Sequence, residues 1–226
     1  MKKVVYSCLF VNGPKKRDQP SINNKLEGWD YIMFTNIPDK LINTGWTPIQ
    51  KPLVNNHPIY SAKHYKWCGH KYLSEYDIAI YVDAYMTPNH NVDWNNYANK
   101  VEVYGISNGI IMMKHPNRAC IYSECNEIHK CRKDTKANME KVINFLKLEG
   151  MPTNYGLTAA GLFIRHLKNN ELNKFCEELF DLMLKFSYRD QSLLSYMFWK
   201  NKQQLNCQLT DKFYIRSGKM GDHSYI

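Results

Sequence analysis

The stretch YDIAIYVDAYMTP, from Tyr76 to Pro88, decides the fold of this chain. Its apolar, β-branched centre is typical of a strand that is buried on both faces, as in a parallel sheet. Asp83 follows that strand directly. Ligands of open α/β sheets bind beyond the carboxyl ends of strands, so Asp83 is the first candidate for a functional site. The alternative is that Asp83 only caps a turn before Pro88.

The segments on either side alternate between strand and helix patterns. Strands are expected over residues 4–11, 31–36, 101–107 and 156–167, and helices over 60–72, 118–131, 135–150, 169–186 and 189–200, followed by a polar tail. This alternation predicts an α/β fold with a mostly parallel sheet flanked by helices. At 226 residues and 44% apolar content the chain can bury a full core. We therefore expect one domain over residues 1–226.

The net charge indicates which class of partner to expect, and the cysteine content indicates the redox state of the compartment. Lys and Arg outnumber Asp and Glu by 30 to 21, which favours phosphate, nucleic acid or an acidic membrane surface as a partner. The seven cysteines are odd in number and scattered, which indicates free thiols and a reducing cytoplasm. The first apolar run is short and no long one follows, so we expect a soluble protein without a membrane span. A peripheral membrane contact stays open.

Four segments together resemble a known group of proteins. They are SAKHYKWCGHKYLSEYDIAIYVDAYMTP (61–88), KHPNRACIYSE (114–124), EGMPTNYGLTAAGLFIRH (149–166) and SYRDQSLLSY (187–196). In this order they resemble glycosyltransferase-A-fold proteins, namely the plant mucilage-related and turgor-regulation-related group and its microbial and viral relatives. The resemblance implies a Rossmann-like glycosyltransferase-A-type domain, with a nucleotide-binding half over about 1–110 and an acceptor-side half over about 111–226. It also implies hexosyl or pentosyl transfer from a UDP- or GDP-sugar to a glycan or glycoconjugate.

Asp83 matches the metal-binding position of that group. The resemblance implies that Asp83 binds Mn²⁺ or Mg²⁺, which bridges to the donor diphosphate. The wider superfamily carries Asp-x-Asp, whereas this chain reads Asp83-Ala84-Tyr85, so one of the two carboxylates is missing. His223 is a candidate nitrogen ligand, with an exposed tail histidine as the alternative. The remaining candidates for donor or nucleotide binding are Phe10, Asn12, Asn36, Lys63, Lys66, Ala84, Tyr85 and Arg189. For the two lysines the alternative is a solvated helix face.

The segment SYRDQ carries the candidate for proton transfer. Asp190 starts a predicted helix, and we expect it to be the general base that takes the proton of the acceptor hydroxyl. Its alternative role is a helix cap. Candidates for acceptor or sugar binding are His115, Arg118, Glu124, Gly161, His166 and Gln191. Arg118 and Glu124 are equally suited to a structural ion pair.

Two other functions compete with sugar transfer. A basic nucleic-acid-binding module is disfavoured because the lysines are dispersed and no nucleic-acid motif is present. A relative that binds nucleotide but is catalytically silent stays open, because the second carboxylate of the motif is missing.

Overall fold

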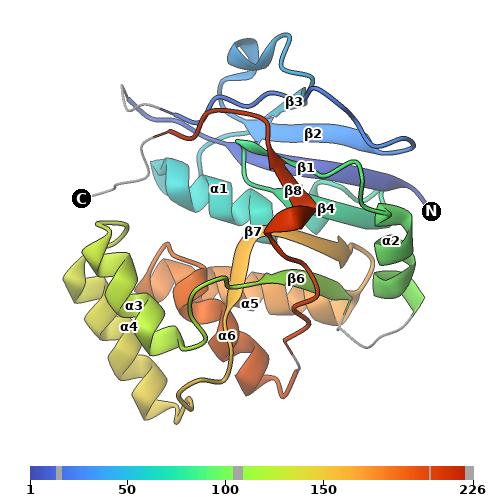
Figure 1. Ribbon diagram of the computed structural model, residues 1–226. Helices are drawn as coiled ribbons and strands as arrows, with labels where there is room; N and C mark the ends of the chain where they lie inside the picture. Colours follow the sequence, from blue (N-terminus) through green and yellow to red (C-terminus); the bar gives the residue numbers. More distant parts are fainter. Residues whose placement is uncertain (14–16, 104–108, 204, 222–226) are drawn as a thin grey trace.

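The computed structural model describes residues 1–13, 17–103, 109–203 and 205–221. A central six-stranded sheet carries helices on both faces, and a two-stranded sheet lies beside it (Figure 1). The central strands are β1 (Lys3–Leu9), β2 (Asp30–Thr35), β3 (Thr47–Gln50), β4 (Ile78–Val82), β6 (Ile110–Lys114) and β7 (Thr158–His166). The small sheet pairs β5 (Met86–Pro88) with β8 (Tyr214–Arg216).

Ten helical segments connect these strands in the described part of the chain. The α-helices are α1 (Pro58–Trp67), α2 (Trp94–Val103), α3 (Ile121–Lys130), α4 (Lys136–Leu148), α5 (Asn170–Phe186) and α6 (Gln191–Lys200). Short 3-10 helices are η1 (Pro38–Leu41), η2 (Val54–Asn56), η3 (Gly69–Lys71) and η4 (Asp211–Phe213). The helices expected over 118–131, 135–150, 169–186 and 189–200 are present as α3, α4, α5 and α6. The helix expected over 60–72 is present as α1, which ends at Trp67 and is followed by η3.

The central sheet has the strand order β3-β2-β1-β4-β7-β6. The strands β1 to β4 pair in parallel, and β7 is antiparallel to both of its neighbours, β4 and β6. All strands except β7 therefore point the same way, which confirms a mostly parallel α/β sheet. This arrangement brings the carboxyl ends of β1 and β4 and the first half of β7 to one edge of the sheet.

Alternate residues of β1 fill two hydrophobic cores, one on each face of the sheet. Tyr6 and Cys8 face the core that α1, α3, α4, α5 and α6 cover. Val5 and Leu9 face the other core, which contains Trp94 of α2. A strand buried on both faces reads as a continuous apolar run, which is why β1 was recognisable from sequence.

The predicted strand over 101–107 is wrong in the part that the structure describes. Residues 101–103 end the helix α2, and residues 104–107 lie outside the described residues. Trp94, Ala98 and Val101 recur at helical spacing, and their buried side chains pack on the sheet. The strand that joins the sheet in this region is β6 instead.

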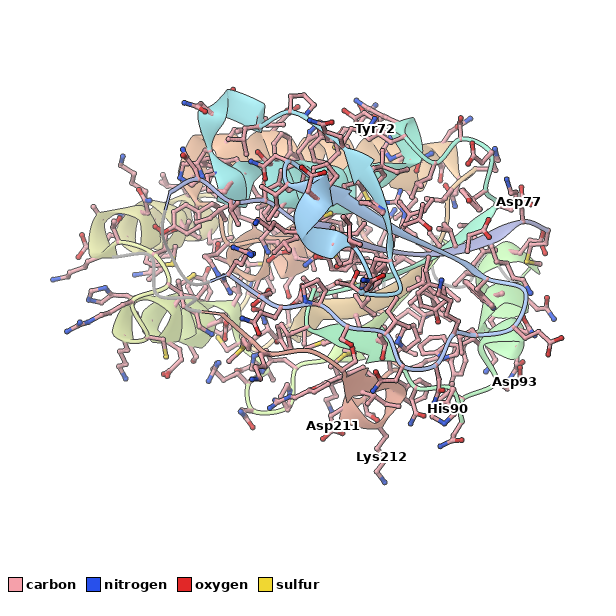
Figure 2. The ribbon with its side chains drawn as sticks, turned by 90° about the horizontal axis from the view of Figure 1, so that it is seen from above. Tyr72, Asp77, His90, Asp93, Asp211 and Lys212 are labelled. Atoms are coloured by element: carbon pink, nitrogen blue, oxygen red, sulfur yellow. The ribbon has the colours of Figure 1, made fainter. Side chains whose placement is uncertain are left out.

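The segment after α6 also contains more structure than the polar tail expected from the sequence. β8 pairs with β5, and Asn89 N–H donates to the carbonyl oxygen of Phe213 at 2.9 Å. Seen from above, Asp211 and Lys212 of η4 lie at the same margin of the molecule as His90 (Figure 2).

All seven cysteines are free thiols. None of the helices in the described residues combines the length and apolar character needed to cross a membrane.

Candidate functional site

A cavity of about 490 Å³ lies at the edge of the sheet where β1 and β4 end. Two walls come from the end of β1 with the loop after it (residues 8–13 and 17–18) and from residues between 56 and 66 in and just before α1. The others come from residues of 81–84 at the end of β4, from Ala160 and Gly161 of β7, and from residues 188–191 at the start of α6. Because parallel strands end together at this edge, segments far apart in sequence meet around one space.

Asp190 lies at the centre of a buried ion cluster in this cavity. Its Oδ1 atom lies 2.8 Å from Lys63 Nζ, and its Oδ2 atom lies 2.8 Å from Lys66 Nζ. The indole Nε1–H of Trp67 also donates to Oδ2, at 3.1 Å. The side chains of Lys66 and Asp190 are each only 2% exposed. Asp190 also caps α6 by accepting the backbone N–H of Gln191 at 3.1 Å.

The cluster contains more positive than negative charge. Lys63, Lys66 and Arg189 surround one carboxylate, and the Nε atom of Arg189 is buried without a hydrogen-bond partner among the described residues. Burial alone would raise the pKa of Asp190, but the three cations outweigh it and hold that pKa well below its usual range. Burial lowers the pKa of Lys63 to about 8, because Asp190 only partly compensates for the lost hydration. A surplus of cations that line a cavity is suited to an anionic ligand.

Tyr81 contacts both Asp83 and this cluster. Tyr81 O–H donates to Asp83 Oδ1 at 3.1 Å, and Lys66 Nζ lies 4.7 Å from the centre of the Tyr81 ring. The backbone N–H of Asp83 donates to the carbonyl oxygen of Gly161 on β7, at 2.9 Å. A β-carbon on Gly161 would lie 3.1 Å from Asp83 Oδ2, so the glycine leaves room for the carboxylate. Asp83 therefore ends a buried strand and also lines the cavity.

The loop after β1 forms one wall of the cavity and carries two of the nucleotide-binding candidates. Phe10 and Asn12 line the cavity, and the Phe10 ring stacks on Tyr65 with centroids 5.0 Å apart. Asn36 does not line it. Its side-chain amide instead bonds both backbone groups of Val11, at 3.0 and 2.8 Å, in the manner of a paired strand. Asn36 thus fixes the loop that carries the cavity wall.

Of the other candidates, Ala84, Gly161 and Gln191 line the cavity. Tyr85 follows Ala84 but does not line the cavity, and its carbonyl oxygen accepts the backbone N–H groups of Ser217 and Gly218. His166 lies at the opposite end of β7 from Gly161, opposite Ile78, and does not reach the cavity.

His115, Arg118 and Glu124 form a cluster of their own after β6. Arg118 Nε donates to Glu124 Oε2 at 2.6 Å, and His115 Nε2 lies 3.5 Å from the same oxygen. His115 Nδ1 accepts the backbone N–H groups of Asn117 and Arg118. These residues follow β6 at the same edge of the sheet but are not part of the cavity wall. Their contacts are those of the structural ion pair that the sequence left open.

The metal candidates are only partly placed. His223 lies outside the described residues. No group of three or more His, Cys, Asp or Glu side chains suited to a metal ion occurs within residues 1–13, 17–103, 109–203 and 205–221. Asp83 supplies one carboxylate to the cavity, and oxygen ligands of this kind fit Mg²⁺ or Mn²⁺, which often bind through one or two carboxylates together with phosphate oxygens and water.

Several cavity residues were not found from the sequence. His57 and Tyr188 line the cavity, and their rings stack with centroids 6.2 Å apart. Tyr60, outside the cavity wall, packs edge-on against Tyr188 at 6.1 Å. Arg17 and Asp18 line the cavity from the loop after β1. The positions of Arg17 and Asp18 depend on the course of this loop. The sequence around them has no helix or strand period that could have indicated that they line the cavity.

No protein-family model and no curated protein matches this chain.

Proposed function

We propose that this protein is a glycosyltransferase that moves a sugar from a nucleoside-diphosphate sugar to a glycan or glycoconjugate. The observation that carries the proposal is the pairing of Asp83 with the cation cluster in one cavity at the carboxyl edge of the sheet. The strand order, with one antiparallel strand next to the strand that ends at Asp83, is compatible with a glycosyltransferase-A-type fold.

The cavity offers both kinds of group that a diphosphate needs. Lys63, Lys66 and Arg189 supply charge to the phosphate oxygens, and this charge would also stabilise the leaving nucleoside diphosphate as its bond to the sugar breaks. Asp83 would hold a divalent cation, which adds a Lewis acid at the diphosphate. A diphosphate without a cation would be repelled by Asp83, so this residue favours metal-supported binding.

The contacts of Asp190 favour a positioning role over the proton transfer expected from the sequence. Both of its oxygens accept from cations or N–H groups, and its pKa is lowered. A carboxylate in that state is a weak base. In the proposed enzyme Asp190 holds Lys63 and Lys66 toward the cavity.

A thermal-shift screen tests the ligand class. Nucleoside diphosphates and nucleotide sugars, each with and without Mn²⁺, should raise the melting temperature by about 5–10 °C at concentrations near a hundred times Kd. Hydrolysis of the stabilising nucleotide sugar, and then transfer to a panel of saccharides, tests the reaction. Salt-sensitive oligonucleotide binding that is tighter than nucleotide binding would instead support the nucleic-acid module. Nucleotide binding without turnover would support the silent relative.

Asp83→Asn tests the site itself. The amide keeps the shape but removes the charge that attracts the cation, so Mn²⁺-supported affinity for a nucleoside diphosphate should fall while the fold is kept. Calorimetry measures the affinity. Asp77→Asn is the matched control, because Asp77 lies just before the same strand and bonds the backbone N–H of Lys2 at 2.7 Å, away from the cavity. Equal affinity of Asp83→Asn and the parent would remove Asp83 from the site.

A further inference from the structure

A buried hydrogen bond joins two loops that are distant in sequence. Ser187 Oγ–H donates to Asp134 Oδ2 at 2.5 Å. Asp134 is 0% exposed and Ser187 is 1% exposed. Asp134 lies just before α4, and Ser187 lies between α5 and α6, three residues before Asp190. Neither residue lines the cavity.

The carboxylate of Asp134 is fixed from its own side. Its Oδ1 atom accepts the backbone N–H of Thr135 at 2.7 Å and the side-chain amide of Asn138 at 2.8 Å. Both partners belong to the start of α4, where a negative charge is also stabilised by the helix dipole. The Oδ2 atom therefore presents a fixed acceptor to Ser187.

Ser187 in turn positions the backbone of Arg189, which lines the cavity. Its Oγ atom accepts the backbone N–H of Arg189 at 3.0 Å, while its own backbone N–H bonds the end of α5. With its proton directed to Asp134, the hydroxyl oxygen keeps its lone pairs for Arg189. The next residue is Asp190, whose carboxylate orients Lys63 and Lys66.

We propose that Asp134 is a positioning residue, which acts through Ser187 to place Arg189 and Asp190 and thereby the cation cluster of the cavity. The placement itself is independent of the ligand. Only its consequence for anion binding rests on the proposed function.

The indole of Trp67 gives a readout that needs no ligand. Its Nε1–H donates to Asp190 Oδ2, so its NMR resonance reports where that carboxylate lies. The chain has five tryptophans, and Trp67→Phe identifies the signal in a spectrum of protein with ¹⁵N-labelled tryptophan. Asp134→Asn and Ser187→Ala should both shift the Trp67 indole signal and leave that of Trp29, in the opposite core, unchanged. Ser187→Thr keeps the hydroxyl and should restore the parent position.

The matched control is Glu149→Gln. It removes another carboxylate acceptor of a hydroxyl, because Tyr196 O–H of α6 donates to Glu149 at 2.7 Å, but it does so at the far end of α4. This variant should leave the Trp67 signal in place even where it lowers stability. If Glu149→Gln moves the signal as much as Asp134→Asn does, the effect is general loosening and the proposal is overturned.

A second measurement follows the binding of inorganic pyrophosphate by calorimetry in the presence of Mn²⁺, because Asp83 would repel the anion without the cation. Affinity should fall by about threefold to tenfold in Asp134→Asn and Ser187→Ala, the loss expected for a misplaced hydrogen-bonded cation. Parent-like affinity in both variants, or an unmoved Trp67 signal in the folded Ser187→Ala protein, overturns the proposal. If the parent itself does not bind pyrophosphate, the proposed function fails, while the Trp67 signal still decides the role of Asp134.

Discussion

The charge of Lys63 in the cavity should depend on pH above neutrality. Its Nζ atom lies 2.8 Å from Asp190, yet burial lowers its pKa to about 8. An anion in the cavity would favour the protonated form and raise that pKa again. By linkage, the protonated form must then bind the anion more tightly than the neutral form does.

The affinity for a nucleoside diphosphate should therefore decrease as the pH rises through about 8. A loss of about tenfold, or about 1.4 kcal/mol, is expected for one charged contact. Titration calorimetry with Mg²⁺ between pH 7 and 9 measures it. Lys63→Met should bind more weakly at pH 7 and show little pH dependence. Lys71→Met is the control, because Lys71 pairs with Glu177 on α5 and should keep the parent profile. A flat profile in the parent would contradict the role of Lys63.

Asp190→Asn should lower the free energy of unfolding by about 3–5 kcal/mol at pH 7, because it leaves the buried Lys66 without its counter-ion. The pKa of Asp190 is lowered in the folded state, so its contribution is present above the unfolded pKa of about 4 and is lost as the pH falls below it. Urea unfolding should thus show the gap between parent and variant narrowing on acidification. The exposed Asp211→Asn should show no such gap. A parent-like Asp190→Asn would mean that the two lysines are hydrated instead.

At the scale of elements, the antiparallel strand β7 shapes the site. It places Gly161 beside Asp83, where the backbone bond between them fixes the end of β4. The sequence indicated this strand and the small residues in it, but not its direction, because the direction depends on how α3 and α4 connect β6 to β7. The strand predicted over 101–107 is wrong over residues 101–103 for a related reason. Its short alternating pattern is also compatible with the buried face of α2.

Gly161→Ala should weaken metal-supported nucleotide binding. The added methyl group would lie 3.1 Å from Asp83 Oδ2, closer than ordinary contact, and would displace that carboxylate by a few tenths of an ångström. Calorimetry with Mn²⁺ should show reduced affinity. The same titration without a divalent cation is the control, and there Gly161→Ala and the parent should have the same affinity. A loss that is equal with and without Mn²⁺ would point to a blocked cavity and not to a displaced ligand.

At the scale of the whole molecule, the carboxyl-terminal segment pairs with the loop after β1. Gln19 and Lys219 exchange two backbone hydrogen bonds, at 2.8 and 3.1 Å. The backbone N–H of Gly221 also donates to Asp18 at 2.7 Å. The segment thus supports a loop that contributes to the cavity wall, which its polar sequence did not indicate.

Gly218→Ala should detach this segment, because a β-carbon there would lie 2.1 Å from the carbonyl oxygen of Gln19. The loss of two backbone bonds should lower the melting temperature by about 3–8 °C. Hydrogen exchange should accelerate at the amides of Gln19 and Lys219. Ser217→Ala leaves that approach intact and should behave as the parent does. Unchanged protection in Gly218→Ala would show that the segment packs in another way.

The sequence predicted the parts of the site that lie on regular elements. Asp83 follows the strand β4, Lys63 and Lys66 lie on α1, and Asp190 caps α6. All four line one cavity. His166 was misplaced because strand polarity decides which end of β7 reaches the cavity. Of the loop residues that line the cavity, Phe10 and Asn12 were predicted, whereas Arg17 and Asp18 were not, since their positions depend on long-range contacts.

The ion cluster also has a consequence for the order in which the protein can be assembled during translation. Lys63 and Asp190 lie 127 residues apart, so the ribosome releases β1 to β4 and α1 long before the counter-ion emerges. Until then, burying the two lysines would leave their charges unpaired, which is costly. We expect α1 of the nascent chain to stay hydrated on its lysine face, so that its final docking waits for the start of α6.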